Sequence, residues 1–389
     1  MTTNHSLTNN TNKDKLSLSN ITLNKQMIPN LVHNMLNVTL YHKMLDIIDS
    51  KNDEDYSYFS DLEMIYLFVH EEKDQDERKN RTKETKQEYL RELLWIYDLF
   101  MNHGEIISFH LSNLDIYSIF KNIERKHIRK FQDWLKIVPN GKGNKPYSVA
   151  TIARKTGIFK SFLTFLYHKK YITKPLHATF KSANIHRRDR PNRDLYTEEA
   201  IQLLHYYEKH PIVFGFLSVL LTTGARIREI STARICDLSY DGDGHWLEVI
   251  GKGNEKRELF IFPNVFQAII DFRKRRGLET NLNKNDKSFL FVTARHRPYS
   301  YKYLSKYLSD ALSRADLPFI NDENRSITPH TLRHGFAIIS AEEGADIFRI
   351  MQALGHKKIE TTMIYLEKHE QRKNHVAKKW KNSSIIQSF

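Results

Sequence analysis

The sequence of 389 residues has little cysteine and no long apolar run. Its single cysteine, Cys236, excludes a disulfide framework and any cysteine-rich zinc module. No stretch approaches the roughly 18 consecutive apolar residues of a membrane span. Residues 1–26 are rich in Asn, Thr and Ser and lack the apolar core of a secretory signal. We therefore expect a cytoplasmic protein with no membrane partner.

Positive charge is what the sequence has in excess. It holds 60 Lys and Arg against 46 Asp and Glu, a net charge of +14, which favours a polyanionic partner. The charge is uneven, because residues 49–77 hold eleven acids and two bases and so carry −9. The rest of the chain therefore carries +23. The acidic stretch suits either a solvated face or a segment that mimics DNA or docks a partner.

Composition and periodicity divide the chain into four regions. Residues 1–80 form a polar and acidic region of unknown role, of which the first 26 are expected to be disordered. Residues 81–180 predict a helical domain, with helices after Thr82, from Ser118 to Leu135, and after the capping residue Ser148. Residues 181–194 form a basic linker, and residues 195–389 form a second domain with a basic tail.

Two basic segments are candidate phosphate contacts. The helix after Ser148 has an apolar side and an opposite side with Arg154, Lys155 and Lys160, which suits either a DNA-facing helix or an ordinary surface helix. The linker suits either a tether that closes around a duplex or an exposed hinge. Its arginines are Arg187, Arg188, Arg190 and Arg193.

The hydrophobic periodicity of the second domain changes midway from helical to strand-like. Between helical segments, Trp246–Ile250 and Glu258–Phe262 read as short strands, joined by a loop that begins Gly251-Lys252-Gly253. There is no internal repeat and no alternating βαβα pattern. We therefore predict a mainly α fold with a small antiparallel β-sheet.

Four segments of this domain have the residue types of a reactive site. They are Thr222–Glu229, Gly251–Gly253, His330–His334, and Leu354–His356 followed by Thr361, Thr362 and Tyr365. Taken singly, each has an ordinary structural explanation. His330 and His334 could bind a metal, but the glutamate of a His-Glu-x-x-His motif is missing and Cys236 adds no ligand set, so we predict no metal site.

Together and in this order, the segments resemble the tyrosine recombinase/integrase family, known for an Arg…Lys…His-x-x-Arg…His/Trp…Tyr series. The matching residues are Arg226, Lys252, His330, Arg333, His356 and Tyr365. Thr-Gly-x-Arg-x-x-Glu and Leu-Gly-His are also present, and the tyrosine follows the last histidine by nine positions. The resemblance covers about residues 195–379. Residues 82–180 look like the family's helical (SAM-like) core-binding domain, whereas residues 1–80 resemble nothing we can name.

The resemblance implies a site-specific DNA recombinase that acts through a 3′-phosphotyrosyl intermediate. Tyr365 would be the nucleophile, His330 the general base and Lys252 the general acid. Arg226 and Arg333 would stabilise the phosphate, since guanidinium groups are always charged and bind phosphate bidentately. His356 would bond a non-bridging oxygen, and Glu229 would orient Arg226 or cap local structure. No metal, nucleotide or other cofactor is implied, because the phosphotyrosyl bond conserves the energy of the broken diester.

The implied partner is double-stranded DNA, bound by a homotetramer that the tail 366–389 would join, with possible accessory proteins and a nucleoid location in the cytoplasm. The expected role is integration or excision of a mobile element, including transposition. Two alternatives stay open: a type IB topoisomerase-like nicking-closing enzyme, and a catalytically silent DNA-binding module.

Overall fold

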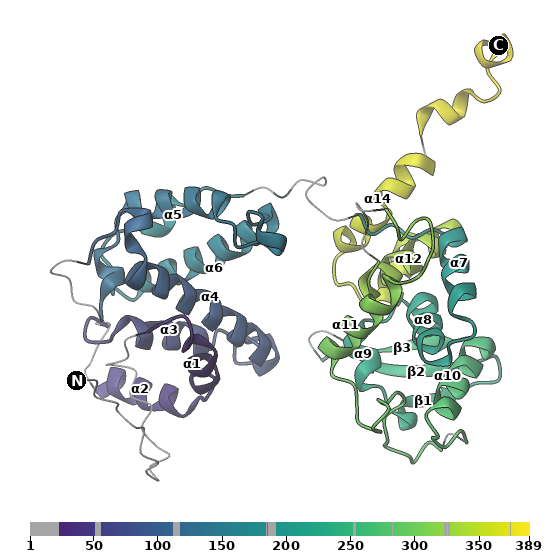
Figure 1. The fold of residues 1–389 in the computed structure, drawn as a ribbon, viewed down its shortest axis with the longest axis horizontal. Coiled ribbons are helices and arrows are strands. Elements are labelled where there is room, and N and C mark those ends of the chain that lie inside the picture. The colour runs from purple at the N-terminus through teal and green to yellow at the C-terminus, as the bar shows by residue number, and fades with distance from the viewer. Residues whose placement is uncertain are drawn as a thin grey trace. The chain divides into compact units, whose positions relative to one another are not determined.

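The chain folds as two compact units. The computed structural model describes residues 23–50, 56–111, 117–183, 185, 192–251, 254–281, 283–322, 325, 327–373 and 375–389. The N-terminal unit extends to Arg190 and the C-terminal unit starts at Pro191 (Figure 1). Three arginines of the predicted linker, Arg187, Arg188 and Arg190, lie outside the described residues. No described helix is both long enough and apolar enough to cross a membrane.

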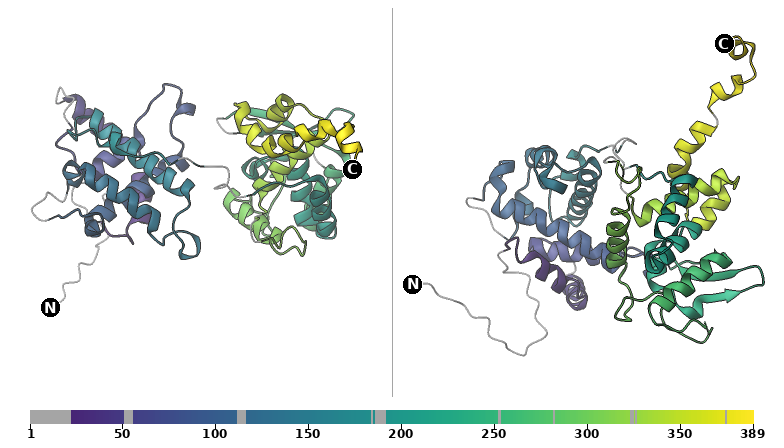
Figure 2. Two further views of the ribbon diagram at one scale, coloured as in Figure 1. Left: turned by 90° about the horizontal axis from the view of Figure 1, so that it is seen from above. Right: turned by 45° about the vertical axis from the view of Figure 1, so that its right-hand side comes forward.

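The N-terminal unit is a bundle of helices around one apolar core (Figures 1 and 2). Its helices are α1 (Ile28–Met35), α2 (Thr39–Ser50), α3 (Asp61–His70), α4 (Lys83–Asn102), α5 (Arg125–Ile137) and α6 (Val149–His168), with short 3-10 helices η1 (Glu77–Lys79), η2 (Gly104–Ile107), η3 (Ile119–Asn122), η4 (Lys142–Asn144) and η5 (Leu176–Thr179). Buried side chains from Leu23 to Phe180 belong to the same cluster. The core of this unit therefore begins well before residue 81.

Part of the acidic stretch is structural. Ser60 and Glu63 form a capping box at the start of α3, in which the Ser60 amide donates to the Glu63 carboxylate over 2.8 Å. The carboxylate of Asp61 is buried and accepts hydrogen bonds from the Tyr171 hydroxyl at 2.8 Å and the Phe120 amide at 3.1 Å. Glu63 therefore caps α3 locally, whereas Asp61 joins α3 to distant segments of the unit.

The prediction of one continuous helix from Ser118 to Leu135 is wrong. The structure divides it into η3 and α5, separated by extended backbone at Ile123 and Glu124. The Phe120 amide within η3 donates to the Asp61 carboxylate, and the Glu124 amide just before α5 donates to the His127 ring, so side chains satisfy one backbone amide at each place. The helix predicted after Ser148 is confirmed as α6, and Ser148 accepts a hydrogen bond from the Thr151 amide.

The C-terminal unit is mainly helical with one small sheet. It contains α7 (Thr197–Tyr207), α8 (Pro211–Thr223), α9 (Ile227–Thr232), η7 (Ile235–Asp237), β1 (Leu238–Tyr240), β2 (His245–Ile250), β3 (Lys256–Ile261), α10 (Pro263–Arg275), α11 (Tyr301–Leu312), α12 (Pro329–Glu342), α13 (Ile347–Leu354), α14 (Ile359–Lys373), η8 (Val376–Trp380) and α15 (Ser384–Gln387). The strands pair antiparallel in the order β1-β2-β3, at the end of the unit away from α14 (Figures 1 and 2).

The predicted hairpin and fold class are confirmed. Strands β2 and β3 pair in a register that places Leu247 opposite Leu259, and both leucines are buried. The sequence missed β1, because three residues are too few to show an alternating pattern. The fold is mainly α with a small antiparallel β-sheet.

Candidate active site

Two glycine turns build the floor of the site. Helix α8 ends at Gly224 (φ 60°) and α13 ends at Gly355 (φ 64°), both in the left-handed region that favours glycine. A Cβ atom on Gly224 would lie 2.5 Å from the ring of Phe336 on α12, so glycine also allows α12 to pack closely. The two turns bring backbone carbonyls from distant segments within reach of the arginines of the site.

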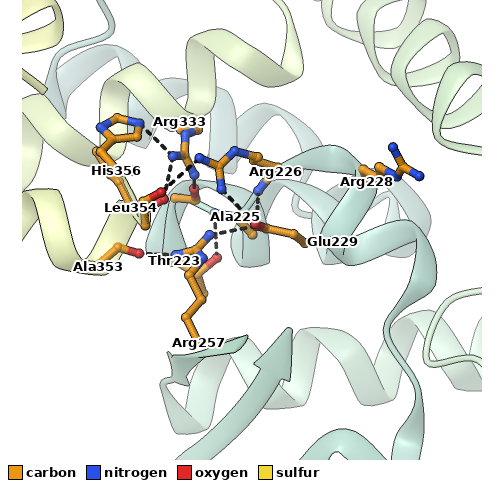
Figure 3. Close-up of polar contacts among 12 residues, drawn as sticks. Thr223, Ala225, Arg226, Arg228, Glu229, Arg257, Arg333, Ala353, Leu354 and His356 are labelled. Carbon is orange, nitrogen blue, oxygen red and sulfur yellow. Dashed lines mark hydrogen bonds and ion pairs between the residues drawn. The ribbon is translucent and has the colours of Figure 1, made fainter. Parts of the chain in front are cut away.

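Arg333 is buried on α12 and is held by hydrogen bonds to other segments of the unit. Its Nη1 donates to the Gly224 carbonyl at 2.5 Å, and its Nη2 donates to the Leu354 carbonyl at 2.6 Å and to His356 Nε2 at 2.9 Å (Figure 3). Burial and the nearby charge of Arg226 lower the pKa of Arg333 to about 10, so it remains a cation at neutral pH. Its guanidinium is thus fixed by both glycine turns.

Arg226 shares a buried carboxylate with a second arginine. Glu229 accepts hydrogen bonds from the Arg226 amide at 2.7 Å, from Arg226 Nη1 at 3.0 Å, and from Arg257 Nη2 at 2.7 Å. Burial raises the pKa of Glu229, but the charges and hydrogen bonds of Arg257 and Arg226 outweigh it and hold that pKa below its usual value. Arg226 Nη2 also donates to the Gly355 carbonyl at 3.2 Å. Glu229 therefore fixes the direction of the Arg226 side chain.

The ring of His356 has a defined tautomer. Arg333 can only donate, so His356 Nε2 accepts and the proton lies on Nδ1, which is 2.9 Å from the hydroxyl of Thr362. Burial and the charges of Arg333 and Arg226 lower the pKa of His356 to about 4. Both ring nitrogens of His356 thus have partners within the protein, and its bond to a phosphate oxygen stays a prediction.

Tyr365 on α14 lies among three histidines. Its side chain is buried, and its ring centroid is 3.7 Å from that of His334, 5.3 Å from that of His356 and 5.9 Å from that of His330. Partial desolvation by the surrounding protein and the charges of neighbouring arginines lower the pKa of His330 to about 4, although the residue itself is exposed. At neutral pH His330 is therefore uncharged and able to accept a proton.

The predicted Lys252 lies outside the described residues, but its neighbour Gly251 is placed. The Gly251 amide donates to the Glu255 carbonyl at 2.7 Å and closes the base of the hairpin. A Cβ atom on Gly251 would lie 3.3 Å from Glu229 Oε1 and 3.7 Å from Arg226 Nη1. The hairpin thus leaves the sheet beside the arginines.

The basic face predicted on α6 needs one correction. Lys155 is buried, and its Nζ lies 2.5 Å from Glu92 Oε2 and 3.9 Å from the centre of the Trp95 ring. Its ammonium group is held inside the N-terminal unit, because an unpaired charge would be costly at this depth. Arg154 is exposed and pairs with Glu92 and Glu88, and Lys160 is exposed.

The sequence does not predict Arg257 as a member of the site. It places His334 and Thr362 in two of the four candidate segments but predicts for neither a role in the recombinase reaction. Arg257 follows Lys252 by five positions on the returning strand of the hairpin, and Thr362 precedes Tyr365 by three positions, one helical turn. Both spacings indicate that these side chains lie near residues of the site. The predicted Arg193 lies near His330 and His334 and helps to lower the pKa of each ring. Among the described residues, no three His, Cys, Asp or Glu side chains group closely enough to hold a metal ion.

The sequence is similar to those of known proteins. The model of the phage integrase family matches residues 193–372. Tyrosine recombinase XerC of Listeria innocua serovar 6a is 30% identical over 228 residues, which cover 57% of this chain and 72% of that protein. XerC of Caldanaerobacter subterraneus subsp. tengcongensis is 29% identical over 250 residues, which cover 62% of this chain and 65% of that protein, slightly under two thirds of its length.

Solved structures agree on the fold. The XerH site-specific recombinase in its post-cleavage complex with palindromic difH substrate has a TM-score of 0.55 and 20% identity, and the match covers 74% of this chain and 79% of that one. A lambda integrase tetramer bound to a Holliday junction also has a TM-score of 0.55, with 16% identity and 81% of each chain covered.

Proposed function

The chain belongs to the tyrosine recombinase/integrase family and is a tyrosine-type site-specific recombinase, and we propose that it cleaves and rejoins duplex DNA through a 3′-phosphotyrosyl intermediate on Tyr365. The observation that carries this proposal is the placement of Tyr365 beside His330 and His356 while His356 bonds to Arg333. The residues proposed as nucleophile, base and phosphate-binding cation all belong to the C-terminal unit, which supports the proposal.

In the proposed reaction, the Tyr365 oxygen attacks the scissile phosphorus and the bond to the 5′ oxygen breaks. The phenol proton passes to His330, whose lowered pKa keeps it neutral beforehand. Lys252 gives a proton to the departing 5′ oxygen, and the reverse steps rejoin the strand. Arg226 and Arg333 balance the charge that develops on the non-bridging oxygens, and His356 supports Arg333.

A nicked suicide substrate, from which the cleaved 5′ fragment diffuses away, tests the chemistry. Wild-type protein should accumulate a covalent complex whose DNA is attached by its 3′ phosphate, and Tyr365→Phe should form none. Tyr303→Phe, at an exposed tyrosine of α11, is the matched control and should behave as wild type. A covalent complex of normal yield with Tyr365→Phe would overturn the assignment. Relaxation of supercoiled DNA of any sequence without strand exchange would instead favour a nicking-closing enzyme.

We further propose that the enzyme acts as a homotetramer that integrates or excises a mobile element, with Arg154, Lys160 and Arg193 among its DNA contacts. The tail supports assembly, because its apolar side chains are exposed, among them Val376, Trp380 and Ile385. The C-terminal unit also has a largely apolar cavity of about 440 Å³ between α7, α8 and α12 that could receive such a segment.

Deleting residues 375–389 tests this assembly. The truncated protein should still bind one half-site but should lose the higher-order DNA complex in gel-shift and light-scattering measurements. Recombination between two sites should fall with it, while cleavage of the suicide substrate should persist. An unchanged tetrameric complex would contradict the role of the tail.

A further inference from the structure

We propose that Arg257 is a positioning residue for the recombinase reaction, which keeps the charge of Arg226 available to the scissile phosphate. The inference rests on the proposed function and adds a residue outside the Arg…Lys…His-x-x-Arg…His…Tyr series. Arg257 stands on β3, next to the first residue of that strand.

Arg257 joins three segments that are far apart in the chain. Its Nη2 is 2.7 Å from Glu229 Oε2 in the first turn of α9, and its Nη1 donates to the Ala353 carbonyl at the end of α13 (Figure 3). Its aliphatic part also lies against the second glycine turn, where a Cβ atom on Gly355 would be 3.0 Å from Arg257 Cδ. One side chain thus fixes the base of the hairpin, the carboxylate of Glu229 and the turn that leads into His356.

The charge balance explains why a second arginine is needed. Glu229 is 2% exposed, and a buried carboxylate requires compensation. If Arg226 were its only partner, the pair would be neutral at the position where the phosphate needs a cation. Arg257 supplies a second positive charge, so the three side chains together carry +1, and Arg333 raises the total to +2. A phosphodiester that gains negative charge during attack is stabilised by this surplus.

Arg257 acts through its neighbours and not on the phosphate. Both of its Nη atoms are engaged by Glu229 and Ala353. Its Nε is buried and has no hydrogen-bond partner among the described residues, and only 12% of the side chain is exposed. These bonds direct both Nη atoms toward the protein, and the small exposed fraction of the side chain leaves little of the guanidinium open to DNA.

The test compares Arg257→Gln and Arg257→Lys with a control, Arg228→Gln. Arg228 is exposed on α9 and points away from Glu229 (Figure 3). Single-turnover cleavage is measured on the suicide substrate and on a copy with a methylphosphonate at the scissile position, which lacks one negative charge. Thermal melting and DNA affinity are measured for each variant.

We expect Arg257→Gln to slow cleavage of the ordinary substrate about tenfold to a hundredfold, with DNA affinity unchanged. On the methylphosphonate the defect should shrink several-fold, because that substrate depends less on positive charge. Arg257→Lys keeps the charge but not the fork of donors, so its cleavage rate should lie between those of wild type and Arg257→Gln. It replaces Arg257→Gln in the test if that variant does not fold.

Wild-type rates for Arg257→Gln would overturn the proposal, as would an equal loss on both substrates, since a merely structural role would reduce both alike. Failure of the proposed function has a different signature. In that case Tyr365→Phe would still form the covalent complex, whatever the Arg257 variants do.

Discussion

Replacing Thr362 by valine tests the tautomer of His356. Thr362 is fully buried on α14, and its hydroxyl oxygen is 2.9 Å from His356 Nδ1. Because Arg333 donates to Nε2, Nδ1 must hold the ring proton and the threonine must accept it. Thr362→Val keeps the branched shape of the side chain but removes this acceptor.

The expected size of the effect follows from the unpaired donor. Leaving a buried N–H without a partner costs about 1–3 kcal/mol. At about 1.4 kcal/mol per factor of ten, cleavage should slow by roughly 5- to 150-fold if the loss falls on the reactive arrangement. Moving the ring proton from Nδ1 to Nε2 would not remove this cost, because an N–H at Nε2 would face the donor group of Arg333.

The assay is single-turnover cleavage on the suicide substrate, combined with ¹⁵N NMR of the His356 ring. The neighbouring Thr361 is exposed, so Thr361→Val is a matched control and should cleave at the wild-type rate. We expect Thr362→Val to be slower and its ring nitrogen shifts to change. A wild-type rate together with unchanged ring shifts would refute the reasoning.

Three further predictions concern stability. Gly224→Ala should melt at a lower temperature than Gly277→Ala, because both positions have positive φ but only Gly224 meets a neighbour, Phe336. Glu92→Gln should lower the unfolding free energy of the N-terminal unit by about 3–5 kcal/mol in urea titration, because it leaves the buried Lys155 uncompensated. Burial first, and then the charges of nearby histidines and arginines, lower the pKa of His334 to about 3, whereas the unfolded ring titrates near 6.5. Between these two pKa values the unfolded ring therefore binds a proton that the folded ring does not. The contribution of His334 to the unfolding free energy is full above pH 6.5 and is lost on acidification, by about 2 kcal/mol at pH 5. His334→Asn should lose less between pH 7.5 and pH 5 in the same titration, and an equal loss would contradict the assignment.

Local pattern was enough to predict much of the C-terminal unit. The hairpin follows from two short apolar runs around a glycine-rich loop, and its strands lie within two residues of their predicted ends. Helix α6 follows from its cap at Ser148 and its spaced aromatic side chains. These features depend on neighbours in the chain, so a sequence contains them directly.

Long-range contacts could not be predicted in the same way. Lys155 has the helical spacing of an exposed residue, but its ammonium group pairs with Glu92 and lies over the ring of Trp95 on α4. Asp61 belongs to an acidic stretch, but the Tyr171 hydroxyl, 110 positions away, binds its carboxylate. Arg257 enters the site only because β3 returns beside α9 and α13. Each outcome depends on which distant group the fold places opposite the side chain.

The position of Tyr365 has a consequence for mixtures of subunits. Its ring lies against His334 of its own chain, in the same unit as Arg226 and Arg333. Two inactive variants, one lacking the nucleophile and one lacking Arg226, would therefore not complement each other for cleavage. In a mixed assembly each strand would be cut or spared according to the subunit bound to it. A Tyr365→Phe subunit would then act as a dominant inhibitor, which occupies its half-site and leaves that strand intact.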